Sequence, residues 1–134
     1  MLIGVSGCAG FVGSVLCHEL LKQGYQVRGL DNIHKGYADS LFGISSHPDF
    51  QFMRGDVTVE KDLEKFLAGL GGVIHLAAIV GLPNCARQPS LSHLVNVTGA
   101  QLISRLKAKI CPDVPLIFSS TVSVYGSIGD YCHE

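Results

Sequence analysis

The chain has 134 residues and a mass of 14.3 kDa, with 47% hydrophobic and only 16% charged residues, whereas an average soluble domain has about 25% charged residues. This length allows one buried core and leaves little room for a second domain, which argues against a two-domain enzyme within these residues. The formal net charge is −1, and without the clustered cations that nucleic acid or an anionic membrane requires, we expect neither as a partner.

The first part of the chain alternates between strand-like and helix-like patterns. A short apolar run, Leu2–Ser6, predicts a strand that is buried on both faces. From Phe11 the period changes, and a helix is predicted up to Gly24, with apolar residues recurring at Val12, Val15, Leu16 and Leu20. Gln26–Leu30 predicts a second strand, and the weakly patterned residues 32–48 predict a long loop with one helical turn.

The rest of the chain repeats this alternation. Phe50–Arg54 predicts a third strand, and a helix is predicted from near Thr58, with an apolar stripe of Leu63, Phe66, Leu67 and Leu70. Val73–Ala77 and Leu116–Ser119 predict the fourth and fifth strands, separated by a helix over about residues 90–109. Strands that alternate with helices are typical of parallel βαβ units, so we predict an α/β fold with a doubly wound sheet.

Three glycines, Gly7, Gly10 and Gly13, lie in the turn between the first strand and the first helix. Glycine there permits positive φ and lets backbone N–H groups approach a phosphate, and the helix N-terminus adds partial positive charge. The spacing is G-x-x-G-x-x-G, which departs from the G-x-G-x-x-G fingerprint of dinucleotide-binding folds. The alternative is a tight turn that serves only close helix packing, but the position after a strand and before a helix favours a phosphate site.

An acidic residue, Asp31, closes the second strand. A dinucleotide fold needs a carboxylate there to accept hydrogen bonds from the adenosine ribose hydroxyls. The same charge repels a 2′-phosphate, and no arginine stands at Cys8 or Asn32 to compensate for it. We therefore predict NAD rather than NADP as the cofactor; the alternative is that Asp31 is a solvated turn residue.

Six motifs in order resemble those of the extended short-chain dehydrogenase/reductases, specifically the NAD-dependent epimerase/dehydratase group that acts on nucleotide sugars. They are Ser6-Gly7-x-x-Gly10-x-x-Gly13, Asp31-Asn32, Gly55-Asp56-Val57, His75-Leu76-Ala77-Ala78, Asn96-Val97-Thr98-Gly99 and Ser119-Ser120-Thr121-Val122-Ser123-Val124-Tyr125-Gly126. The resemblance implies a Rossmann-like doubly wound parallel sheet that is truncated after the fifth strand. Residues 1–134 would form an incomplete NAD-binding domain, without the C-terminal substrate domain.

The resemblance also implies roles for individual residues. Thr121 would be the catalytic Ser/Thr, because a hydroxyl at the carboxyl edge of the sheet can hydrogen-bond a reacting substrate oxygen; alternatively, it is a strand-end residue bonded to backbone. Ser120 and Tyr125 would contact the sugar, although Tyr125 could simply pack. The implied cofactor-binding residues are Gly7, Gly10, Phe11, Val12, Gly13, Asp31, Asn32, Asp56, Val57, Leu76, Ala77, Ala78, Asn96 and Ser119.

The family's reaction needs a Tyr-x-x-x-Lys pair for acid–base chemistry, and no such pair occurs in the chain. We therefore expect a fragment of a longer enzyme or a truncated gene product. If the chain ends at Glu134, its exposed fifth strand would favour self-association. The leading interpretation is the cofactor-binding part of an NAD-dependent nucleotide-sugar epimerase or dehydratase that acts by transient hydride transfer. The alternatives are a non-catalytic NAD-binding or sensing module and a net reductase of the same fold.

The cysteines and histidines indicate no further chemistry. The five cysteines are scattered and never spaced as C-x-x-C, and the six histidines show no ligand spacing, so we expect no disulfide framework and no metal. The chain lacks a signal-peptide pattern, and a reducing, cytoplasmic location is predicted. His75 is predicted to be a hydrogen-bonded core residue and Cys8 a small packing residue, while Asn84 or Arg87 could contact a substrate phosphate or sugar.

Overall fold

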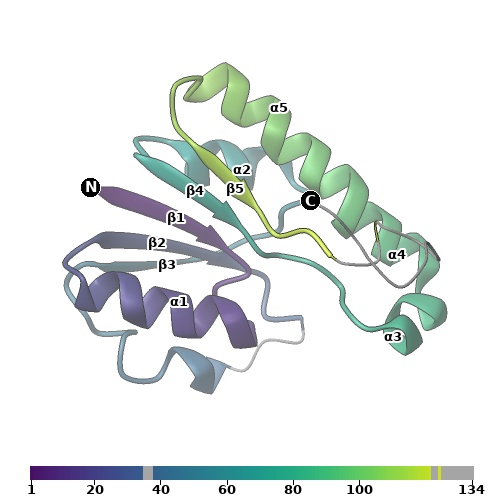
Figure 1. Cartoon of the computed structure of the whole chain (residues 1–134), viewed down its shortest axis with the longest axis horizontal. Helices are drawn as coiled ribbons and strands as arrows, with labels where there is room; N and C mark the ends of the chain where they lie inside the picture. Colours follow the sequence, from purple (N-terminus) through teal and green to yellow (C-terminus); the bar gives the residue numbers. More distant parts are fainter. Residues whose placement is uncertain (35–37, 122–123, 125–134) are drawn as a thin grey trace, which may run out of the picture.

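The computed structural model describes residues 1–34, 38–121 and 124. Five parallel strands form one sheet in the order β3-β2-β1-β4-β5 (Figure 1). The strands are β1 (Leu2–Ser6), β2 (Gln26–Asp31), β3 (Phe50–Arg54), β4 (Gly72–His75) and β5 (Leu116–Phe118). The strand order reverses at β1, which pairs with β2 on one side and with β4 on the other. The predicted α/β fold with a doubly wound parallel sheet is confirmed.

The helical elements follow the predicted order with two differences. They are α1 (Phe11–Lys22), η1 (Ala38–Leu41), α2 (Glu60–Leu67), α3 (Leu82–Arg87), α4 (Pro89–His93), η2 (Leu94–Gly99) and α5 (Ala100–Ile110). Where one helix was predicted over about residues 90–109, a π-helical segment, η2, separates α4 from α5. The short helix α3 was not predicted; because it buries no residue, it leaves no apolar periodicity in the sequence.

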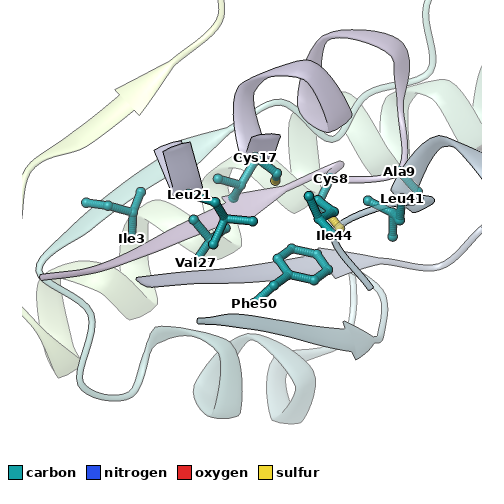
Figure 2. Packing of buried hydrophobic residues seen from close by; sticks show 10 residues of the cluster. Ile3, Cys8, Ala9, Cys17, Leu21, Val27, Leu41, Ile44 and Phe50 are labelled. Carbon is teal, nitrogen blue, oxygen red and sulfur yellow. The ribbon is translucent and has the colours of Figure 1, made fainter. Parts of the chain in front are cut away.

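Both faces of the sheet carry an apolar core. The face under α1 is packed with Ile3, Val5, Cys8, Ala9, Cys17, Leu21, Val27, Leu41, Ile44 and Phe50 (Figure 2). The opposite face, covered by α2 and α5 (Figure 1), is packed with Leu30, Val57, Leu63, Phe66, Leu67, Leu70, Val73, Ile103 and Leu106. Strands buried on both faces need apolar residues at successive positions, which accounts for the mean hydropathy of +0.34.

The helix α1 does not bury the valines that the apolar pattern of its sequence includes. Val12 and Val15 are 62% and 61% exposed, whereas the buried positions are Gly13, Ser14, Cys17 and Leu21. A Cβ at Gly13 would clash with the carbonyl oxygen of Gly7, so only glycine fits at this point of closest approach. This close contact, rather than the valines, fixes the rotation of α1 about its axis.

The start of α2 also differs from the prediction. The helix begins at Glu60, and the hydroxyl of Thr58 donates a 2.7 Å hydrogen bond to Asp56 Oδ1 instead of capping the helix. The predicted stripe is nevertheless buried: Leu63, Phe66 and Leu67 lie within α2, and Leu70 packs beyond its end. Periodicity therefore located the buried positions correctly but not the helix boundary.

Candidate cofactor site

The loops that follow β1, β2, β3 and β4 border one cleft of about 570 Å³ at the carboxyl edge of the sheet. This volume lies within the range of small-molecule sites, and the position is the switch point at which doubly wound folds bind ligands. Ten of the predicted cofactor-binding residues line the cleft. They are Gly7, Gly10, Phe11, Asp31, Asn32, Asp56, Val57, Leu76, Ala77 and Ala78.

The three glycines of the first turn serve different purposes. Gly7 has a φ of +76°, and a Cβ there would lie 2.7 Å from the backbone nitrogen of Ala77. Gly10 lines the cleft and is the N-cap of α1, where no side chain bonds the helix amides, which leaves first-turn amides for an external acceptor. Gly13 packs against Gly7 and does not line the cleft. The turn is therefore tightly packed at Gly7 and at Gly13. Between these two glycines, the backbone amides at the N-terminus of α1 are free to bind a ligand.

The carboxylate of Asp31 joins two loops at the cleft. Its Oδ2 accepts a 2.9 Å hydrogen bond from the amide of Ala9, and its Oδ1 accepts a 2.8 Å bond from the amide of Ile33. Ile33 has a φ of +58°, a conformation that this bond helps to hold. Asp31 is half-buried, and because each carboxylate oxygen has two lone pairs, both retain capacity for a ligand donor. Asp31 is therefore an acceptor held in place by two backbone amides, one of which closes a local turn.

A second carboxylate, Asp56, forms a network with its neighbours. Its Oδ1 accepts hydrogen bonds from the amide and the hydroxyl of Thr58, and its Oδ2 accepts one of 2.8 Å from Nδ2 of Asn32. Burial by itself raises the pKa of Asp56, but the hydrogen bonds from Thr58 and Asn32 and the nearby His34 outweigh it, so the pKa lies below its ordinary value. Asp56 is thus ionised at neutral pH and accepts hydrogen bonds only.

The opposite wall of the cleft is the loop after β4. Residues 76–80 all line the cleft, as does Asn84, whose Nδ2 donates a 3.0 Å hydrogen bond to the carbonyl of Val80. Asn96, predicted to bind the cofactor, does not line the cleft; both ends of its amide are hydrogen-bonded to the backbone of Ile79. Arg87 is exposed and also lies outside the cleft lining.

The residues predicted for catalysis and substrate contact follow β5 in the chain, as does Ser119, which was predicted to bind the cofactor. Ser119, Ser120 and Thr121 are exposed and are not part of the cleft lining. The amide of Ser119 donates a 3.4 Å hydrogen bond to the carbonyl of His75, which places this segment beside the end of β4. Val12 is likewise outside the lining, and Tyr125 lies outside the described residues.

Several lining residues were not predicted. Thr58 could have been found from the Asp-x-Thr spacing, which favours a local turn with side-chain hydrogen bonds. Ser40, whose hydroxyl donates to the carbonyl of Ala9, and Leu91 and Val95 are brought to the cleft by tertiary packing alone. The remaining unpredicted members are Ala9, Ser14, Leu30, His34, Gly55, Ile79 and Val80.

His75 and Cys8 are packing residues, as predicted. His75 is buried, its Nδ1 shares a 2.6 Å hydrogen bond with the hydroxyl of Ser6, and its ring stacks on Phe118 at 5.6 Å. Burial lowers the pKa of His75 to about 4, so the ring is neutral at pH 7. Cys8 is fully buried, and burial raises the pKa of its thiol, which disfavours the reactive thiolate.

Two classes of site are not found in residues 1–34, 38–121 and 124. No group of three or more His, Cys, Asp or Glu side chains within this part of the chain is placed to hold a metal ion. None of its helices has the length and apolar character needed to cross a membrane.

Comparison with known sequences gives one family. Residues 3–132 match the model of the NAD dependent epimerase/dehydratase family. The UDP-glucose 4-epimerase of Mycolicibacterium smegmatis is 33% identical over 125 residues, which are 92% of this chain and 40% of the relative. The UDP-glucose 4-epimerase of Halalkalibacterium halodurans is 36% identical over 129 residues, 94% of this chain and 36% of the relative. The chain thus spans about two fifths of these curated relatives.

Solved structures give the same result. The dTDP-glucose 4,6-dehydratase of Streptomyces venezuelae, solved with NAD bound, superposes with a TM-score of 0.90 at 28% identity, covering 98% of this chain and 42% of that one. The UDP-glucose 4-epimerase of Thermotoga maritima, solved with UDP-glucose, superposes with a TM-score of 0.85 at 29% identity, covering 98% of this chain and 41% of that one.

The packing of Gly7 against β4 can be tested by comparing Gly7→Ala with Gly24→Ala. Both glycines have a positive φ, but a Cβ at Gly24 would meet nothing within 4 Å. Gly24→Ala should therefore lower the free energy of unfolding by about 1 kcal/mol, the cost of the backbone conformation alone. Gly7→Ala should lower it by roughly 3 kcal/mol or more, because Ala77 must also move. Urea unfolding measures both, and equal losses would contradict the close packing.

The buried state of His75 predicts a pH dependence of stability. Since its pKa is about 4 in the folded protein and about 6.5 when unfolded, the unfolded state binds the proton more tightly. Stability should therefore be full above pH 6.5 and fall as the pH drops towards 4, by roughly 3 kcal/mol from this group. His75→Gln should reduce that slope in urea unfolding from pH 7 to 4, with His93→Gln, at an exposed histidine, as the matched control. An unchanged slope in His75→Gln would refute the prediction.

Proposed function

The chain belongs to the NAD-dependent epimerase/dehydratase family, and from this premise we propose that it is the cofactor-binding part of a nucleotide-sugar epimerase or dehydratase. The family's cofactor is NAD. The observation that carries the proposal is that the glycine turn and two fixed carboxylates, Asp31 and Asp56, share one cleft at the switch point of the sheet.

The residues of the cleft fit a dinucleotide. The N-terminus of α1 has no acidic residue in its first turn and no side-chain cap, so its amides suit the pyrophosphate. Asp31 offers acceptors to the adenosine ribose hydroxyls, and Asp56, held by Asn32 and Thr58, offers an acceptor to the amino group of adenine. The loop at residues 76–80 would then form the wall beside the nicotinamide half.

The charge of the cleft supports NAD over NADP. Asp31 is fixed by two backbone amides and cannot turn away from a ribose phosphate without losing them. No Lys or Arg is among the described residues that line the cleft. A 2′-phosphate would therefore bring two negative charges beside a carboxylate with no compensating cation.

The proposed reaction is a transient oxidation of a sugar carbon, for which bound NAD supplies the hydride acceptor and donor. We assign Thr121 the catalytic hydroxyl, and Ser120 and Tyr125 contacts with the sugar, on the strength of the family motif. The hydrogen bond from the amide of Ser119, which begins this motif, to the carbonyl of His75 at the end of β4 supports the assignment. No Tyr-x-x-x-Lys pair lies in the 134 residues, so the acid–base step is not assigned to them. A second candidate function, which rests on the same cleft, is a module that binds NAD without catalysis.

We also propose a reducing, cytoplasmic compartment. Cys8, Cys17, Cys85 and Cys111 are free thiols, and free thiols in this number are typical of proteins that are kept reduced.

Replacing the carboxylate of Asp31 tests the NAD site. Wild type should bind NAD more tightly than NADP in isothermal titration calorimetry. Asp31→Asn removes the charge and one acceptor oxygen, so it should weaken NAD binding about tenfold or more and narrow the preference over NADP. Asp49→Asn, at an exposed carboxylate that precedes β3 at the opposite edge of the sheet, is the control and should bind like wild type. No binding of NAD by wild type would refute both candidate functions, and tighter binding of NADP would refute the stated preference.

For a protein made of these 134 residues alone, we propose self-association through the exposed edge of the described sheet. β5 pairs only with β4 among the described strands, and its Ile117 and Phe118 are 60% and 54% exposed. Sedimentation equilibrium should show an average mass that rises with protein concentration. Ile117→Lys should lower this average mass, because it places a charge on the exposed strand β5. Val15→Lys, which places the same charge at an exposed valine on α1, is the matched control. A monomer at high concentration in wild type would contradict the proposal.

A further inference from the structure

The glycine turn after β1 is held from outside at Ala9, which lies between Gly7 and Gly10. The amide of Ala9 donates a 2.9 Å hydrogen bond to Oδ2 of Asp31, and its carbonyl accepts a 2.7 Å bond from the hydroxyl of Ser40. Ala9 is only 1% exposed, so water has almost no access to replace a lost partner there. Both polar groups of Ala9 therefore depend on the segment that follows β1 and α1 in the chain, from the end of β2 to η1.

Ser40 reaches Ala9 from a segment that the core holds in place. It lies in η1, and two residues that follow it, Leu41 and Ile44, are buried. Figure 2 shows their side chains in the same buried cluster as Ala9. Ser40 itself is half-buried and lines the cleft. The packing of its neighbours therefore presents the hydroxyl of Ser40 to the turn, independently of Asp31 at the end of β2.

The hydrogen bond from Ser40 fixes the direction of the peptide that leads into α1. The carbonyl of Ala9 and the amide of Gly10 belong to the same peptide, and a planar trans peptide points these two groups in opposite directions. While Ser40 binds the carbonyl, the amide donates a 3.1 Å hydrogen bond to the carbonyl of Gly7. Gly10 is the N-cap of α1, so this peptide sets the direction of the helix amides that follow it.

These helix amides are the groups that the proposed function assigns to the pyrophosphate of NAD. The first turn of α1 has no acidic residue and no side-chain cap, so binding of an anion there depends on the orientation of the backbone. A turn whose orientation is fixed before the ligand arrives loses less conformational entropy on binding. Loss of the hydrogen bond from Ser40 should therefore weaken binding of the phosphates in particular.

We propose that Ser40 is a positioning residue for the pyrophosphate of the dinucleotide, acting through the carbonyl of Ala9. This inference rests on the proposed function. It goes beyond that function because it makes the order of the phosphate-binding turn depend on a residue of η1, outside the glycine motif. The hydrogen bond is present without a ligand, so the turn is set before the cofactor binds.

The test compares Ser40→Thr with Ser40→Val, whose new side chains have nearly the same shape, although only threonine has a hydroxyl. Ser40→Val should weaken binding of ADP and of NAD about fivefold or more, since a hydrogen bond is lost and a buried carbonyl is left without its donor. Adenosine, which lacks the phosphates, should change by less than about twofold, and Ser40→Thr should keep most of the ADP affinity. Calorimetry measures ADP and NAD, and an NMR titration measures adenosine.

Amide hydrogen exchange in the free protein separates positioning from a direct contact with the phosphates. Without any ligand, the Gly10 amide of Ser40→Val should exchange faster than that of wild type, because the peptide that it shares with Ala9 is no longer held. The Val5 amide in β1 should stay protected, which shows that the variant is folded. Ser45→Val, at an exposed serine beyond η1, is the matched control and should match wild type in every readout.

A third variant guards against a side chain that does not fit. Ser40→Ala removes the hydroxyl without adding bulk, so it should give the same pattern as Ser40→Val. Equal ADP affinity of Ser40→Thr and Ser40→Val, equal weakening of ADP and adenosine, or unchanged exchange of the Gly10 amide would overturn the positioning role alone. Failure of wild type to bind NAD, ADP and adenosine would overturn the proposed function and this inference together.

Discussion

The close approach of the glycine turn to its neighbours is the constraint on which the rest of the site depends. Because there is room for no Cβ at Gly7 beside Ala77 or at Gly13 beside Gly7, the first helix is drawn down onto the sheet. This contact sets the rotation of α1 and brings its uncapped N-terminus to the edge where the loops after β2, β3 and β4 converge. A larger side chain at either position would separate the helix from the loop after β4, which forms the opposite wall of the cleft.

The cleft divides chemically into a polar and an apolar side. On the polar side, Asp31 and Asp56 are each fixed by neighbouring donors, so their acceptor oxygens are oriented before any ligand arrives. Pre-oriented acceptors lower the entropic cost of binding a ligand that offers donors. On the other side, residues 76–80 present small and apolar side chains, and their backbone is held from behind by Asn96. The cleft therefore suits a ligand with two different ends. One end would offer hydrogen-bond donors to the carboxylates, and a flatter, less polar end would lie against residues 76–80.

The apolar composition of the chain explains why the candidate site lies at the carboxyl edge of the sheet. With cores on both faces of the sheet, the central strands β1 and β4 have no free face for a site. Polar groups placed inside such a sheet must be neutral and paired, as Ser6 and His75 are. Charged acceptors can therefore stand only where the strands end, and the carboxyl ends are where parallel strands deliver loops from several βαβ units to one place.

The sequence by itself determined the order of strands and helices, the glycine turn and Asp31, because these depend on local periodicity and on residues next to strand ends. It also located His75 as a core residue. The tertiary structure alone decided which face α1 buries, since periodicity reports spacing and not rotation, so that Val12 and Val15 are exposed. It also decided the π-helical segment and the pairing of Asn96 with Ile79. The hydrogen bonds between Asn96 and Ile79 join residues that are not neighbours in the chain. The partner of Asn96 is the backbone of Ile79, and because every residue has a backbone, the sequence carries no signal that identifies this partner.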